Sequence, residues 1–262
     1  LRPLQNPILY SDRRSLTQAE QLQKLINFDE LFSITANAVT AGATSVSSMH
    51  WFRQNRPELY QKTRWFGHIN TFLLARMSGE VAFDPTNASY TGLFDTVHTR
   101  SWSTHLCTTF DTDPEKLPPV RKSSEICGLL RHKDLIALKI PANTPIVIGA
   151  ADTASAALAC GVLHAGQAFE SSGTTDVLSV CVDKPMFSPF LVNRCHAVDD
   201  RWLYQCVHSS SAAALRWGMQ ASGFSAASAS YERFSEFASQ QPAGAGGACF
   251  LPFVNGERCR IW

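Results

Sequence analysis

Two features that direct chains to membranes or out of the cell are missing from this sequence. No apolar run reaches about 18 residues, the length needed to span a bilayer. No charged start followed by an apolar stretch and a small-residue cleavage site is visible, so no signal-peptide pattern is recognised. We therefore expect a cytoplasmic protein with no membrane partner.

Charge of one sign is also missing. The 23 Lys and Arg residues nearly balance the 22 Asp and Glu residues, which leaves a net charge of +1, and no basic run interrupts the chain. Nucleic-acid-binding domains carry a clustered basic surface, so this balance predicts no nucleic-acid partner. A chain of 262 residues is long enough to bury one large core or two modest ones.

Paired metal-ligand spacing is missing as well. None of the 8 cysteines forms a Cys-x-x-Cys pair, and the histidines are scattered along the chain. Zinc sites and redox motifs depend on such pairs, so we expect neither, and no metal-binding residue is assigned. Most cysteines lie in apolar surroundings and are interpreted as reduced core residues.

The most informative stretch that is present covers residues 145–176. An apolar strand leads into small residues and one acid, Asp152, at the position of a helix N-cap; Gly161 then stands where a helix ends. Gly173, Thr174 and Thr175 form a polar turn between two strands and can offer backbone N–H groups and hydroxyls to an anion. Each feature alone is more often an ordinary cap or hairpin turn, but their order and spacing together indicate a phosphate site.

This order resembles the FGGY carbohydrate kinases. The family's Gly-Gly-Gly-Asp segment is similar to residues 149–152, and its small-residue helix to residues 153–160. Its Gly-Val pair is similar to residues 161–162, and its Ser-Leu-Gly-Thr-Ser turn to residues 171–175. Four further segments resemble family patterns in the same order: residues 7–14, 83–95, 117–128 and 251–258. Two departures stand out. Ser48 replaces a Lys three residues before Trp51, and Ala150 and Ala151 replace two glycines.

The resemblance implies an α/β, actin/hexokinase-like fold with ribonuclease-H-like halves, present here in part. Residues 1–160 would be the late part of the N-terminal, sugar-side domain, and residues 161–262 the early part of the C-terminal, ATP-side domain. The family's opening Asp-x-Gly-Thr/Ser strand and its later adenosine-binding region are not found. We therefore expect an internal piece of a kinase that would be inactive when made alone.

The resemblance also implies site residues. Asp152 would be the general base that accepts the proton of the attacking hydroxyl. Gly173, Thr174 and Thr175 would hold the phosphates of ATP, and Asp12 and Arg13 would join Asp152 at the sugar. ATP and Mg²⁺ would be the cofactors, and the resemblance leaves open whether the protein is a monomer or a homodimer.

The expected reaction is ATP-dependent phosphorylation of a sugar or polyol hydroxyl, with a ketopentose such as xylulose as acceptor. Three alternatives stay open: a glycerol kinase-like polyol kinase, favoured by residues 117–125; an inactive sugar-binding relative, favoured by Ser48; and a structural fragment.

Hydrophobic periodicity and turn residues predict the elements. Thr17 and Glu20 suggest a capping box at the first helix. Helices are expected at about 18–26, 45–55, 65–77, 102–109, 153–160, 211–221 and 231–240, and strands at about 145–151, 168–172, 177–182, 202–207 and 248–253.

Overall fold

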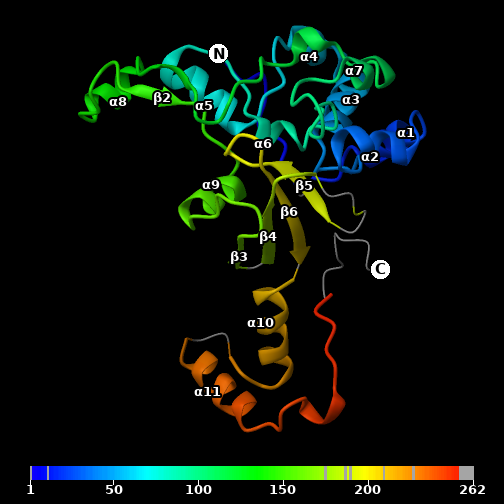
Figure 1. Ribbon diagram of the computed structural model, residues 1–262, viewed down its shortest axis with the longest axis vertical. Coiled ribbons are helices and arrows are strands. Elements are labelled where there is room, and N and C mark those ends of the chain that lie inside the picture. The colour runs from blue at the N-terminus through cyan, green and yellow to red at the C-terminus, as the bar shows by residue number, and fades with distance from the viewer. Residues whose placement is uncertain are drawn as a thin grey trace.

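The computed structural model describes residues 2–10, 12–173, 176–185, 188, 191–208, 210–225 and 228–253. Figure 1 shows three parts along the long axis: a helical layer at one end, a sheet in the middle, and two helices at the other end. Helices and strands are mixed, and the α/β class expected from the sequence is confirmed.

The helical layer is formed by the first half of the chain. Its elements are α1 (Leu16–Gln23), α2 (Phe28–Thr35), α3 (Ser45–Asn55), α4 (Pro57–Lys62), α5 (Ile69–Ser78), α6 (Pro85–Ala88), α7 (Thr104–Thr109), η1 (Pro114–Lys116) and α8 (Lys133–Ala137). Apolar side chains from α1, α3, α7 and the loop before α7 meet in one core, in which Leu22, Leu93 and Phe110 are fully buried. Burial of this apolar surface is the main source of the layer's stability.

Two antiparallel sheets complete the fold. β1 (Ile126–Leu129) pairs with β2 (Pro145–Val147) beside α5. The larger sheet has the order β3 (Ala168–Ser172), β4 (Asp176–Val182), β6 (Trp202–His208) and β5 (Val192–Cys195). β3 and β4 form the predicted hairpin, with Ser172 opposite Asp176.

The edge strand β5 fixes the larger sheet against the helical layer. Asn193 donates from its side chain to the carbonyl of Ala36 at 3.0 Å, and Asn37 bonds the backbone of Asn193 in return. The Trp202 indole donates to the carbonyl of Thr96 at 2.7 Å. Since these polar groups are largely buried, each bond removes a desolvation cost that would otherwise oppose the contact.

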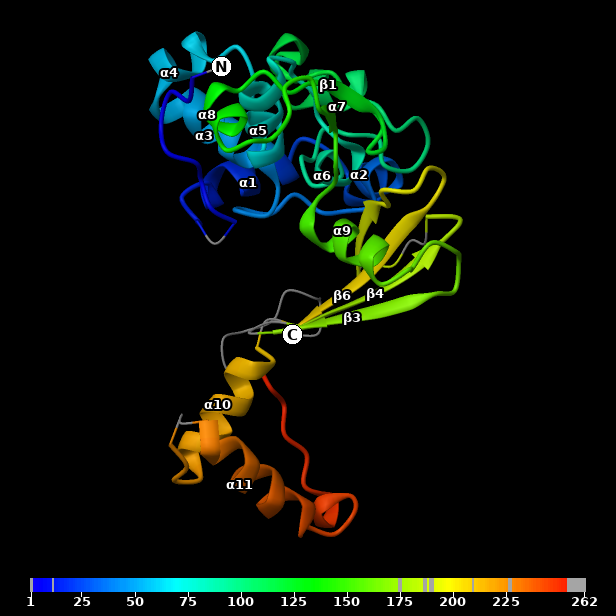
Figure 2. The same ribbon diagram turned by 90° about the vertical axis from the view of Figure 1, so that its left-hand side faces the viewer.

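Helix α9 (Asp152–Ala159) connects the two parts and packs on one face of the larger sheet, as Figure 2 shows. Its Ala154 and Ala157 are fully buried, so the small side chains allow close approach. The helix ends as predicted: Gly161 has a φ of +72°, and Val162 donates to the carbonyl of Ala157 at 2.9 Å. This is the Schellman arrangement, which favours glycine at that position.

Helices α10 (Ala212–Ala221) and α11 (Ser228–Ser239) lie beyond the end of the sheet, followed by the short helix η2 (Ala245–Gly247). The strand predicted at 248–253 is wrong, because these residues pair with no strand in the described chain. The capping box is also wrong: the N-cap of α1 is Ser15, whose side chain makes no capping bond.

Candidate functional site

Asp152 lies at the junction between the helical layer and the sheet. It is the first residue of α9, and Ala151 rather than Asp152 is the N-cap, which corrects the predicted position by one residue. Its side chain is 96% exposed and accepts a hydrogen bond from the backbone N–H of Thr153 at 2.6 Å. A carboxylate in the first turn of a helix is stabilised by the helix dipole and remains free to meet a ligand.

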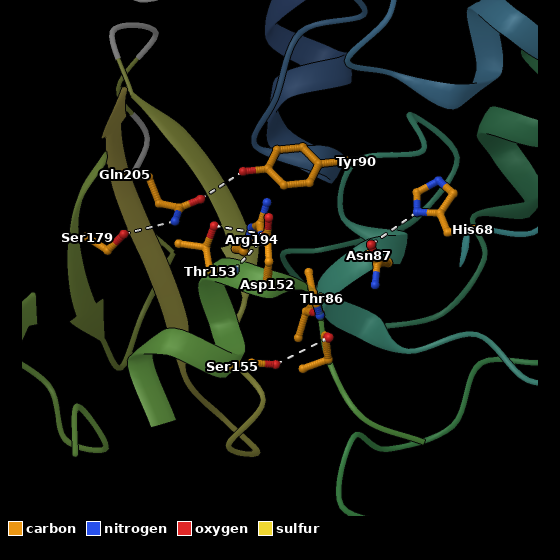
Figure 3. A network of polar contacts seen from close by, with 12 residues as sticks. His68, Thr86, Asn87, Tyr90, Asp152, Thr153, Ser155, Ser179, Arg194 and Gln205 are labelled. Carbon is orange, nitrogen blue, oxygen red and sulfur yellow. Dashed lines mark hydrogen bonds and ion pairs between the residues drawn. The ribbon is translucent and has the colours of Figure 1, made fainter. Parts of the chain in front are cut away.

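Arg194 on β5 is the group of opposite charge nearest to this carboxylate. Its Nη1 atom lies 3.9 Å from Oδ1 of Asp152, although the Arg194 side chain is only 9% exposed. Figure 3 shows the two side chains close together at the start of α9. The pair joins a buried cation to an exposed anion, at a distance too long for a hydrogen bond.

A chain of side chains holds the guanidinium in place. It lies over the ring of Tyr90, 4.2 Å from the ring centre. The Tyr90 hydroxyl donates to Gln205 at 2.8 Å, and the amide of Gln205 donates to Ser179 at 2.9 Å (Figure 3). Stacking on the face of an aromatic ring stabilises a guanidinium and restricts its rotation. Arg194 is therefore held in place before any ligand arrives.

The segment around residues 84–87 positions the backbone that precedes Asp152. Thr86 accepts a hydrogen bond from the backbone N–H of Ala151 at 2.7 Å, and its hydroxyl donates to the carboxylate of Asp84. Asp84 is fully buried, caps α6 by accepting from the Asn87 N–H at 3.0 Å, and also accepts from Asn70. The start of α9 is therefore tied to the helical layer through one side-chain hydroxyl.

His68 extends this polar group into the core. One ring nitrogen lies 3.1 Å from the side-chain oxygen of Asn87, and the other lies 2.8 Å from the hydroxyl of Ser45. Burial lowers the pKa of His68; the Asn87 bond and the negative charge of Asp84 oppose that shift, and the positive charge of Arg194 adds to it. The lowered pKa favours the neutral imidazole.

The predicted phosphate turn lies at the other end of the sheet. Gly173 follows β3 and accepts a hydrogen bond from the backbone N–H of Ala212, the first residue of α10, at 3.1 Å. Thr174 and Thr175 lie outside the described residues. On β6, Leu203 is the partner of Arg194, and His208 lies level with Ser172 at the end of β3. The distance along β6 between these two positions is roughly 16 Å, and this distance separates Arg194 from the turn.

The predicted sugar-side pair, Asp12 and Arg13, lies in the segment before α1. Asp12 is ion-paired with Arg14 at 2.6 Å, and this hydrogen-bonded partner lowers the pKa of the Asp12 carboxyl. Arg13 donates to the carbonyl of Ala41. Gly42 permits this packing: it has a φ of +79°, and a Cβ there would lie only 2.3 Å from the carbonyl oxygen of Tyr10. No bond joins Asp12 or Arg13 to Asp152 among the described residues.

The described ranges contain neither a metal-binding cluster nor a membrane-spanning helix. No group of three or more His, Cys, Asp or Glu side chains gathers there in a way that could hold a metal ion. In the same part of the chain, no helix is both long and apolar enough to cross a membrane.

Sequence reasoning missed Arg194 and the role of Thr86. The residues from Val192 to Cys195 were not predicted as a strand, because Asn and Arg interrupt the apolar alternation that marks strands. The sequence offered one indication of Arg194: it is a charged residue directly before the segment Cys195-His196, which is buried in the structure. Arg194 and Asp152 lie 42 residues apart in the sequence. Only the topology of the sheet brings them together.

Comparison with known proteins gives a family match and several relatives. Residues 1–159 match the N-terminal domain of the FGGY family of carbohydrate kinases. A xylulose kinase from Escherichia coli (strain K12) is 29% identical over 259 residues, which cover 98% of this chain and 52% of that protein. An autoinducer-2 kinase from Yersinia pestis (strain Pestoides F) is 27% identical over 209 residues, covering 79% of this chain and 39% of that protein.

Solved structures of sugar kinases share the fold. The crystal structure of a xyloylose kinase from Brucella ovis is 27% identical and superposes with a TM-score of 0.85, covering 97% of this chain and 51% of that one. A gluconate kinase from Lactobacillus acidophilus reaches a TM-score of 0.88 at 20% identity, covering 99% and 52%, and supports the fold alone. The actin/hexokinase-like fold is thereby confirmed, and the chain spans about half the length of the relatives that match nearly all of it.

Proposed function

This chain belongs to the FGGY family of carbohydrate kinases, and on that premise we propose that the whole protein transfers a phosphoryl group from ATP to a hydroxyl of a sugar or polyol. One observation carries the proposal to this chain's own residues. Asp152 presents an exposed carboxylate at the first residue of α9, and the Thr86–Ala151 hydrogen bond holds the backbone directly before it.

The proposed role of Asp152 is that of general base. A sugar hydroxyl has a pKa far above neutrality, so its attack on phosphorus is assisted when a positioned carboxylate accepts its proton. Phosphoryl transfer otherwise depends on positioning and on neutralising charge. Two observations support this role for Asp152: its oxygens are open to a ligand, and Thr86 holds the backbone N–H of the preceding Ala151.

The remaining site residues belong to the same proposal. Gly173, with Thr174 and Thr175, would hold ATP phosphates through backbone N–H groups, and Asp12 and Arg13 would lie on the sugar side. Mg²⁺ would accompany the phosphates of ATP, whose oxygens it prefers. The described residues supply no cluster for a resident metal. A requirement for ATP agrees with the expected cytoplasmic location.

A domain boundary near residue 160 is part of the proposal. The family match ends at residue 159, and α9 ends at Ala159. Residues 161–262 would then begin the ATP-side domain. β5 would contribute to the contact between the two domains, because Asn193 donates to the carbonyl of Ala36 and the backbone N–H of Cys195 donates to the hydroxyl of Ser89.

A ketopentose such as xylulose is the proposed acceptor. The support is the Escherichia coli xylulose kinase, which matches 98% of this chain. The test is a coupled assay of ADP release by the whole protein, with ATP, Mg²⁺ and a panel of D-xylulose, D-ribulose, L-ribulose, glycerol and D-gluconate. Highest kcat/KM with a ketopentose supports the assignment. Highest kcat/KM with glycerol would replace it by the polyol alternative, and no release with any acceptor would contradict the kinase function.

A further inference from the structure

Arg194 carries charge that the described structure leaves without a close partner. Its Nε and Nη1 atoms are buried and make no hydrogen bond. Asp152 is the nearest anion, but at 3.9 Å it is beyond hydrogen-bond distance and its carboxylate is mostly in water. Buried cations are normally paired and hydrogen-bonded, so these N–H groups are expected to meet an anionic acceptor when the site is filled.

The position of Asp152 identifies that acceptor. If Asp152 is the base, the attacking hydroxyl lies about 3 Å from its carboxylate. The γ-phosphorus then lies about 3–3.5 Å from that hydroxyl oxygen in the reactive complex. Because Nη1 of Arg194 is 3.9 Å from the same carboxylate, a phosphoryl group on the Arg194 side of Asp152 has its oxygens within reach of the guanidinium.

We propose that Arg194 is a further catalytic residue that binds the transferring phosphoryl group, and afterwards the phosphate of the sugar-phosphate product. This inference rests on the proposed kinase function. The acceptor oxygen forms a bond to the γ-phosphorus, and the bond from that phosphorus to the bridging oxygen breaks, so ADP leaves with the electron pair. The hydroxyl proton passes to Asp152. Arg194 neutralises charge on the phosphoryl oxygens during the transfer.

Stacking on Tyr90 and the Tyr90–Gln205–Ser179 hydrogen bonds hold the guanidinium ready. Such preorganisation is what makes a charged group effective in catalysis.

The test uses the whole protein and the variant Arg194→Met, which keeps much of the side-chain length and removes the charge. Arg100→Met is the matched control, because Arg100 also stacks on an aromatic ring of the sheet, that of Trp202, at 4.2 Å but does not contact Asp152. We expect Arg194→Met to lower kcat by roughly 10²–10³-fold. The dissociation constant of D-xylulose 5-phosphate should rise roughly 10- to 100-fold, and that of D-xylulose should change less than about threefold. Arg100→Met should leave all three values near those of the wild type.

Equal binding of D-xylulose 5-phosphate by the wild type and Arg194→Met would overturn the inference, as would parallel losses for the sugar and its phosphate. If Arg194→Met does not fold, the decision passes to Arg194→Lys, which keeps the charge and loses the planar fork. That variant should still bind D-xylulose 5-phosphate more tightly than D-xylulose. A wild type that binds the two ligands equally would contradict the role. A wild type that phosphorylates no acceptor refutes the proposed function and this inference with it; an active wild type with an equally active Arg194→Met refutes this inference alone.

Discussion

At the scale of single residues, the site combines a free side chain with a fixed backbone. Asp152 extends into solvent, whereas the N–H of its neighbour Ala151 is bonded to Thr86. Arg194 shows the reverse arrangement, since its side chain is buried and held on Tyr90. An exposed acid next to a buried, stacked cation suits a reaction in which a proton moves at the acid and negative charge develops beside the cation.

Gly173 provides the first residue-scale prediction. In Gly173→Val, a branched side chain would stand where backbone must approach phosphate, so we expect a raised KM for ATP of at least about tenfold. Sugar binding should stay close to the wild-type value. The check is steady-state kinetics with ATP varied, together with calorimetric sugar binding. A well-folded variant with an unchanged KM for ATP would show that this turn serves only as a hairpin.

The sequence predicted Asp152 at the start of a helix and gave no prediction for Arg194, and the difference has a physical reason. An acid between an apolar strand and a small-residue helix leaves a local pattern within a few residues. The Arg194–Asp152 contact depends on β5 joining the edge of β6, and strand pairing over that separation has no local signature. The placement of Asp12 and Arg13 at a sugar stays a prediction.

At the scale of elements, α9 determines how closely the helical connection approaches the sheet. Ala154 and Ala157 face Phe169 and Leu203 in a shared core, whereas Ala159 is exposed on the same helix. The sequence predicted this helix, the hairpin of β3 and β4, and α3 at nearly their observed bounds, because their periodicity or turn residues are local. It did not predict β1 or β5, which are short, interrupted by polar or small residues, and stabilised by distant partners.

The close contact of α9 predicts an asymmetric response to larger side chains. Ala157→Leu adds volume to a filled interface and should lower the free energy of unfolding by about 1–3 kcal/mol. Ala159→Leu, on the exposed side, should change it by less than about 0.5 kcal/mol. Urea unfolding of both variants followed by circular dichroism measures the difference. Equal effects would show that the buried face of α9 is not tightly packed.

At the scale of the whole molecule, buried and partly buried histidines should make stability depend on pH. Burial is the main cause that lowers the pKa of His50, His68 and His196 below 6.5. In the folded state these histidines therefore stay neutral at pH values where the same histidines of the unfolded chain already bind protons. Stability contributed in this way is present above about pH 6.5 and falls as the pH drops through the folded-state pKa values.

His196 allows this prediction to be tested at one residue. Its Nδ1 accepts from the Val198 N–H at 2.8 Å, so Nε2 carries the proton that faces the Val162 carbonyl at 3.0 Å, and protonation of Nδ1 would break the first bond. We expect the thermal midpoint to fall between about pH 6.5 and 5, and to fall less in His196→Gln. His164→Gln, at an exposed site, is the control and should follow the wild type. A midpoint that rises on acidification would contradict the sign.

The most direct test of the central claim compares the wild type and Asp152→Asn in the whole protein. The measurement is ADP release with ATP, Mg²⁺ and the best sugar of the panel, combined with calorimetric binding of that sugar. Asn keeps the size of the side chain and cannot accept the proton as a carboxylate does. We predict sugar-dependent ADP release by the wild type, a kcat at least roughly 10²-fold lower in Asp152→Asn, and sugar affinity within about threefold. Turnover by Asp152→Asn near the wild-type rate would contradict the assignment of Asp152 as the base, and with it the site described around α9.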